Sequence, residues 1–143
     1  MIGQQPSCFE EIAHTADVAV RVWGRSLPEL FEHAAYAMFR LMAGEELELV
    51  EPRHQQDVHV VSLDVESLLV DWLTELLIIF ATTGELVVRA RVGELAEKRL
   101  RARVWTGPLP GALHKEIKAV TYHGLRVERD PKGMWWATIV FDV

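Results

Sequence analysis

Apolar residues recur at helical spacing along the stretch SLPELFEHAAYAMFRLMAG. They return every third or fourth residue, which puts them on one face of a helix. Ser26 followed by Glu29 makes a capping box, and Pro28 falls in the first turn, where its missing N–H has no consequence. Gly44 offers a stop because glycine readily adopts the backbone conformation that ends helices. The pattern therefore predicts a helix that begins after Ser26 and ends at Gly44.

A second stretch is apolar on almost every side. It begins after Asp64, which can cap a helix, and continues to about Thr83. Its polar surface is little more than Asp71, Thr74 and Glu75. A helix that is hydrophobic all round is normally buried, so we expect this one in the middle of the fold.

Alternation of apolar and polar residues predicts strands in the rest of the chain. The predicted runs are 9–12, 18–23, 57–63, 86–92, 99–105, 117–128 and 134–143. An acidic loop containing Pro52 precedes the third run. Asp130 to Gly133 is a strong turn signal, which makes the last two runs a hairpin. We therefore expect one α+β domain spanning residues 1–143, with about seven mostly antiparallel strands and two helices.

Composition excludes some classes of protein. With 143 residues, half of them apolar, the chain is long enough for one core. A formal charge of −6 argues against a surface built wholly to coat nucleic acid, although it leaves room for a local basic patch. The start MIGQQPSCFEE lacks the features of a secretory signal, and the single cysteine, Cys8, cannot form an internal disulfide. The apolar run at 76–81 is far shorter than the roughly 20 residues of a membrane span. We expect a cytoplasmic protein without a membrane span.

Asp17 and Asp142 have the most unusual positions among the acidic residues. Asp17 precedes the alternating run at 18–23, and Asp142 lies in an apolar strand end beside the α-carboxylate of Val143. Negative groups this close repel one another unless a cation lies between them. If Asp17 joined them, the ligands would all be oxygens, which favours calcium or magnesium over zinc. Spacing alone does not prove that residues 17 and 142 meet. A turn aspartate and a solvated terminal aspartate remain the simpler interpretation.

An enzymatic interpretation uses the same aspartates. In a metal-dependent hydrolase, Asp17 and Asp142 would hold the ion, and His14 or His123 would act as general base. The sequence has no HExxH motif, no Cys/His pair at zinc-ligand spacing, no nucleophile elbow and no phosphate-binding glycine loop. For both histidines, hydrogen bonds that fix strand ends are the simpler role.

Five arginines lie on two successive predicted strands, and on each strand the arginines share one face. They are Arg89, Arg91, Arg99, Arg101 and Arg103. If the strands pair with those faces aligned, the guanidinium groups gather into a patch suited to phosphate or to an acidic protein surface. A direct RNA-binding module is therefore an alternative. We expect no aromatic residue to alternate with the arginines as a stacking platform, so an ordinary solvated face is favoured over nucleic-acid binding.

Four segments resemble the archease family. FEEIAHTADVAVRVWGRSLPELFEHAAYAMFRLM is similar to the family's first third, LLVDWLTELLIIF to its central helix, and EIKAVTYHGLRVE with the terminal IVFDV to its end. Several linked motifs in the right order, over nearly the whole chain, are more specific than any one of them. Ala19 departs from the family, which often has glycine there, and this affects only local backbone geometry.

The resemblance implies an accessory protein of RNA ligation and not an enzyme. Archeases assist the RtcB-type tRNA-splicing ligase, by promoting transfer of GMP from GTP to a ligase histidine and by allowing repeated turnover. The family's metal site uses the aspartate of the HTAD motif and the last two residues, which here are Asp17, Asp142 and Val143. Calcium is the ion that the family implies. The family also resembles strand-helix-strand-strand modules, which implies two helices packed against a curved sheet.

Three further residues are candidates for contacts with a partner. Lys118, in the IKAVTYH motif, would contact phosphate or the ligase, and His14 and His123 are the other two. A chaperone-like modulator of a tRNA methyltransferase is a role also attached to the family, and it remains an alternative.

Overall fold

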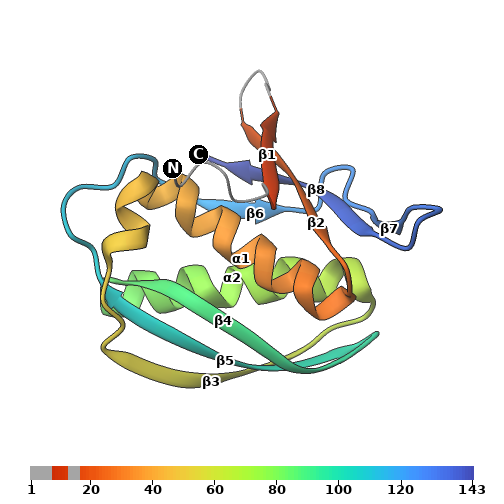
Figure 1. Cartoon of the computed structure of the whole chain (residues 1–143), viewed down its shortest axis with the longest axis horizontal. Helices are drawn as coiled ribbons and strands as arrows, with labels where there is room; N and C mark the ends of the chain where they lie inside the picture. Colours follow the sequence, from red (N-terminus) through yellow and green to blue (C-terminus); the bar gives the residue numbers. More distant parts are fainter. Residues whose placement is uncertain (1–7, 13–16) are drawn as a thin grey trace.

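The computed structural model describes residues 8–12 and 17–143, and these form two long helices and two antiparallel sheets (Figure 1). In chain order the elements are β1 (Phe9–Ile12), β2 (Val18–Gly24), α1 (Leu27–Ala43), a 3-10 helix (Gly44–Leu49), β3 (His54–Val61), α2 (Val65–Thr83), β4 (Glu85–Ala96), β5 (Arg99–Pro108), β6 (Ala119–Thr121), β7 (Val127–Arg129) and β8 (Trp135–Asp142). The predicted α+β class and mostly antiparallel pairing are confirmed.

The two helices lie between the two sheets (Figure 1). One sheet has the strand order β1–β2–β8–β6, with β7 also paired to β8, and the other has the order β3–β5–β4. Helix α1 contacts β2 and β4, while α2 contacts β6 and β4, so each helix packs against both sheets. The side chains between these layers form one hydrophobic core cluster. The outer face of each sheet is thereby left for contacts with other molecules.

Helix α1 begins and ends where the sequence predicts. The N–H of Glu29 donates to Ser26 Oγ at 3.2 Å. The Glu29 carboxylate in turn accepts the N–H of Arg25 at 2.8 Å. In a standard capping box it would accept the N–H of the cap residue itself, which here is Ser26. At the other end Gly44 has a φ of 68°, a left-handed conformation that a residue with a Cβ adopts with strain.

Helix α2 is buried, as its apolar sequence predicts. Asp64 caps it by accepting the N–H of Ser67 at 2.7 Å. Trp72 is fully buried, and its indole N–H donates to the backbone oxygen of Phe31 in α1 at 3.0 Å. Neither α2 nor any other helix in the described part of the chain is long and apolar enough to cross a membrane.

The C-terminal hairpin has one more strand than predicted. The run 117–128 is divided into β6 and β7, and both pair with β8. Gly124 lies between them with a φ of 62°, which interrupts the extended backbone. The described residues therefore form eight strands, where the pattern predicted about seven. A 3-10 helix at Gly44–Leu49 also occupies part of the segment that was expected to be a loop.

The turn between β7 and β8 is the one that the sequence predicts. The Asp130 carboxylate accepts the N–H groups of Lys132 and Met134 at 2.8 and 2.9 Å. The N–H of Asp130 donates to the oxygen of Met134 at 2.8 Å. Gly133 has a φ of 88°, which glycine adopts without strain. Local chemistry alone therefore determines this turn.

Both tyrosines of the chain have raised pKa values. Burial and a hydrogen bond to Glu48 raise the pKa of Tyr36, on α1, to about 12. Burial and the nearby Asp71 carboxylate raise the pKa of Tyr122. An alkaline titration of the folded protein, followed by tyrosinate absorbance, should therefore show one tyrosine, Tyr36, ionising near pH 12 and not at the ordinary value of about 10. Tyr36→Phe should remove the step near 12.

The raised pKa of Tyr36 also sets the sign of an effect on stability. Its stabilising contribution is complete below the unfolded pKa of about 10, and it is lost as the pH rises from there through the folded value of about 12. Tyr36→Phe should lose less stability than the parent protein across that interval, as measured by urea unfolding. Ionisation of Tyr36 at a pH of about 10 in the folded protein would contradict its raised pKa.

Candidate metal site at the strand ends

Strands β2 and β8 bring Asp17 and Asp142 to the same end of one sheet. The strands are antiparallel neighbours, and their last described pair at this end is Val18 with Phe141. Asp17 directly precedes Val18 and Asp142 directly follows Phe141, so each aspartate is the neighbour of the last pair in this ladder. Opposed positions in such a ladder, as Val18 and Phe141 are, have Cβ atoms about 5 Å apart. The pairing therefore brings together two residues that sequence spacing could not join.

Alternation along β8 explains how this strand end is arranged. Phe141 is fully buried, Asp142 is exposed, and Val143 packs against the core again. Because successive side chains of a strand point to opposite faces, Asp142 points outward while its neighbours anchor the backbone. Asp17 is half-buried. The α-carboxylate of Val143 thus follows directly after an outward carboxylate on a well-packed strand.

The other predicted partner residues lie around β6. Lys118 donates its backbone N–H to the oxygen of Asp142 at 2.7 Å, since β6 pairs with this end of β8, and its side chain is exposed. His123 follows the other end of β6, where its N–H donates to Thr121 Oγ1 at 3.3 Å. The structure therefore brings the backbone of Lys118 to that of Asp142 and leaves His123 at the opposite end of the strand. His14 lies outside the described residues.

The donor set at these strand ends fits a hard cation. The carboxylates of Asp17 and Asp142 and the α-carboxylate of Val143 offer only oxygen atoms, the ligands that calcium and magnesium prefer. Among residues 8–12 and 17–143, no group of three or more His, Cys, Asp or Glu side chains is arranged to hold a metal. Backbone oxygens, water or a partner would therefore have to complete the roughly six to eight ligands of calcium.

A groove of about 610 Å³ borders this end of the sheet. It lies between α2 and the segment 113–122, and Lys118 is one of its lining residues. Ile78 and Tyr122 also line it and are 49% and 56% exposed, respectively. The Tyr122 hydroxyl donates to Asp71 at 3.4 Å, so this polar residue of α2 helps to hold the wall of the groove. The sequence indicated a polar position at Asp71 but not the groove.

The five arginines share the outer face of the β3–β5–β4 sheet, as the alternation predicts. Arg91 opposes Arg103 in the ladder, and Arg89 opposes Trp105. The guanidinium carbon of Arg89 lies 4.7 Å from the centre of the Trp105 ring. The expectation that no aromatic residue accompanies the arginines is therefore wrong. The run RLRARVW contained the signal, because Trp105 follows Arg103 by two residues and so shares its face.

A second group of aromatic residues, which sequence reasoning missed, lies on the other sheet. Trp23 opposes Trp136 in the β2–β8 pair, and Arg21 lies 5.4 Å from the centre of the Trp136 ring. No local pattern could indicate this contact, because it depends on the register between the two ends of the chain.

Comparison with known proteins identifies relatives over nearly the whole chain. The model of the archease protein family (MTH1598/TM1083) matches residues 9–143. Protein archease of Thermococcus gammatolerans is 37% identical over 141 residues, covering 94% of this chain and 98% of the relative. Protein archease of Methanosarcina mazei is 37% identical over 143 residues, covering 94% of this chain and 95% of the relative.

Two solved structures share the fold. The solution structure of protein 1598 from Methanobacterium thermoautotrophicum has a TM-score of 0.75 at 32% identity and covers 95% of this chain and 99% of its own. The crystal structure of an archease from Thermotoga maritima, described as a "possible chaperone", has a TM-score of 0.67 at 23% identity and covers 94% of this chain and 96% of its own. At that identity the second likeness shows the fold alone. The match to the family model and the two relatives at 37% identity show that the chain belongs to the archease family.

Proposed function

We propose that this protein is an accessory protein that activates an RtcB-type RNA ligase, in tRNA splicing or RNA repair. In this proposal it promotes guanylylation of the ligase and its repeated turnover, and it is not itself an enzyme. Membership of the archease family supports an accessory role. We expect the two proteins to meet in the cytoplasm.

The observation that carries the proposal is the pairing of β2 with β8. It brings Val18 and Phe141, the neighbours of Asp17 and Asp142, into one pair at the strand end that also carries the α-carboxylate of Val143. Like charges opposed on neighbouring strands destabilise a sheet unless something offsets their repulsion. A cation bound at these strand ends would offset the repulsion between the carboxylates, which supports a role in binding a cation.

We assign a chemical role to each residue of this site. Asp17, Asp142 and the α-carboxylate of Val143 would hold calcium or another hard divalent cation such as magnesium. Bound there, the cation would supply positive charge to stabilise the phosphates during guanylyl transfer in the ligase. The paired strand ends would keep the three carboxylates in position. The exposed ammonium of Lys118 would contact a phosphate or an acidic group of the ligase.

A ligation assay with limiting cognate ligase tests the proposal. With GTP, a divalent cation and RNA ends to be joined, the ligase should complete many turnovers only when this protein is present. Its guanylylation should also be faster. Equal turnover with and without the protein would contradict the proposal.

The same preparation separates the alternative functions. The protein alone should not hydrolyse phosphoester substrates in the presence of divalent cations, whereas a metal-dependent hydrolase would. If pull-down from the native cytosol recovers a tRNA methyltransferase and no ligase, the methyltransferase alternative replaces ligase activation.

A further inference from the structure

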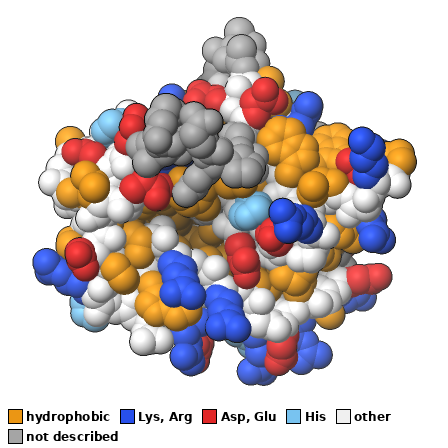
Figure 2. Space-filling model, in the orientation of Figure 1, with side chains coloured by type: hydrophobic (Ala, Val, Ile, Leu, Met, Phe, Trp, Pro, Cys, Tyr) orange, Lys and Arg blue, Asp and Glu red, His pale blue; other side chains and the backbone are white. Residues whose placement is uncertain are grey.

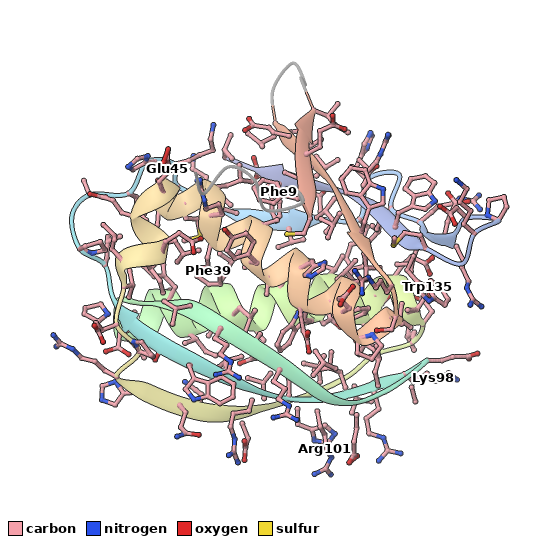
Figure 3. All side chains as sticks on the ribbon, viewed as in Figure 1. Phe9, Phe39, Glu45, Lys98, Arg101 and Trp135 are labelled. Atoms are coloured by element: carbon pink, nitrogen blue, oxygen red, sulfur yellow. The ribbon has the colours of Figure 1, made fainter. Side chains whose placement is uncertain are left out.

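We infer that the outer face of the β3–β5–β4 sheet binds single-stranded nucleic acid. We call this surface the arginine face. It consists of Arg89, Arg91, Arg99, Arg101, Arg103 and Trp105. All five arginines are exposed, and Arg101 points away from the helices (Figure 3). The inference does not rest on ligase activation, because the arginine face belongs to the sheet that does not carry Asp17 and Asp142.

Positive charge is concentrated on the arginine face although the whole chain is acidic. Across the ladders, the acidic residues that oppose these arginines are Asp57, opposite Arg103, and Glu94, opposite Arg101. Asp57 accepts a hydrogen bond from Arg103 at 3.0 Å. Five arginines against these two carboxylates leave the surface positive on a protein of formal charge −6. Basic side chains gather at the lower margin of Figure 2, where β3, β4 and β5 lie in Figure 1. Segregated charge of this kind attracts a polyanion.

The arginines are spaced for repeated phosphate contacts. Residues two apart on a strand project from the same face about 6.5 Å from one another, and neighbouring strands are about 4.8 Å apart. Arg91, Arg101 and Arg103 also line a hollow of about 460 Å³ together with His59 and Trp105. Each guanidinium group can donate two parallel hydrogen bonds to one phosphate. A chain of phosphates could therefore occupy several arginines at once.

Trp105 adds a surface on which a base can stack. The guanidinium carbon of Arg89 lies over its ring, 4.7 Å from the ring centre, beside the other arginines. Unpaired bases stack on aromatic rings and on guanidinium planes, and proteins that bind single strands combine such surfaces with a basic track. The combination distinguishes the arginine face from an ordinary solvated strand surface.

The composition of the arginine face favours nucleic acid over an acidic protein. Protein interfaces have a core depleted of charge and enriched in apolar and aromatic residues. Here charged side chains occupy the centre, and Trp105 is the large aromatic residue among them. Interfaces with nucleic acid are more polar and far more positive. The outer face of this sheet also has no helix that could enter a major groove, so an unpaired strand fits it better than a duplex.

Binding of a fluorescein-labelled oligouridine, followed by anisotropy, tests the inference without any ligase. If three or four arginines contact phosphates, the logarithm of the association constant should fall with the logarithm of salt concentration with a slope of about −2 to −3. A labelled oligothymidine forms a second arm. Equal binding of both indicates contacts to phosphate and bases, and tighter RNA binding adds contacts to the 2′-hydroxyl; both support the inference.

Two sets of variants locate the surface. Arg91→Gln with Arg101→Gln should weaken binding about tenfold or more and reduce the magnitude of the salt slope by about 1 to 1.5. The matched control, Arg25→Gln with Arg126→Gln, removes two exposed arginines outside the β3–β5–β4 sheet and should change little. Trp105→Ala should weaken binding, and Trp105→Phe should retain most of it because a stacking ring remains.

Three outcomes would overturn the inference. The first is that neither oligonucleotide binds at low salt. The second is that the control variant loses as much affinity as the variant of the arginine face. The third is that polyglutamate competes as effectively as unlabelled oligouridine. Circular dichroism melting of each variant ensures that a loss of binding reflects the surface and not the fold. Failure of this assay would leave the ligase assay unaffected, since the two use different surfaces and readouts.

Discussion

Asp142→Asn will reduce ligase stimulation to the level of the ligase alone and will lower calcium affinity by at least about tenfold. The side chain keeps its size and its outward position on β8 but loses its charge. Asp17→Asn should have the same effect, because the β2–β8 ladder brings both residues to one place. Calorimetric titration with calcium and the limiting-ligase assay measure the two consequences separately.

Thermal stability gives this prediction an independent readout. Calcium should raise the melting temperature of the parent protein, because a ligand that binds only the folded state stabilises it. The increase should be lost in Asp142→Asn, while the calcium-free variant should be as stable as the parent or slightly more stable, since one of two opposed negative charges is removed.

Matched variants control for a general loss of negative charge. Glu75→Gln and Glu97→Gln neutralise exposed carboxylates on α2 and in the turn between β4 and β5, two segments that carry none of the proposed ligands. Both should retain stimulation and calcium binding. A glycine appended after Val143 moves the α-carboxylate away from Asp142 and should weaken calcium binding. Full stimulation by both aspartate variants would exclude the proposed site.

Trp72→Ala will destabilise the protein by about 3–5 kcal/mol. Trp72 is the largest fully buried side chain in the described part of the chain, and it lies in α2, which, like α1, packs against both sheets. The substitution leaves a cavity and removes the indole hydrogen bond to Phe31, which joins the two helices. Urea unfolding followed by circular dichroism should show a lower midpoint with a similar slope.

Two further variants separate the parts of this effect. Trp72→Phe keeps an aromatic ring but removes the hydrogen bond to Phe31, and it should cost about 1–2 kcal/mol. Trp136→Ala removes a tryptophan that is only half-buried, and it should destabilise clearly less than Trp72→Ala. Equal losses for the two alanine variants would contradict the central position of Trp72 in the core.

The arginine face shows how far alternation alone carries a prediction. Side chains alternate along a strand with a period of two, and this pattern correctly predicted that the five arginines lie on one side of adjacent strands. The prediction succeeded because side-chain direction in a strand is a local property. The stack of Arg89 on Trp105 was missed even though the pattern indicated a shared face. Pairing register and a bulge between Val92 and Glu94 decide which side chains oppose each other, and neither follows from local sequence.

The sequence by itself determined the elements whose causes are local. Ser26 and Asp64 cap the helices, Asp130 and Gly133 form the hairpin turn, and the apolar surface of α2 requires burial. Only the tertiary structure decided that Val18 and Phe141, the neighbours of Asp17 and Asp142, pair at one end of a sheet. That contact is part of the pairing between β2 and β8, where Arg21 bonds to Thr138 across 117 residues. Such pairing depends on how the helices bury both sheets at once, and no short stretch of sequence specifies that arrangement.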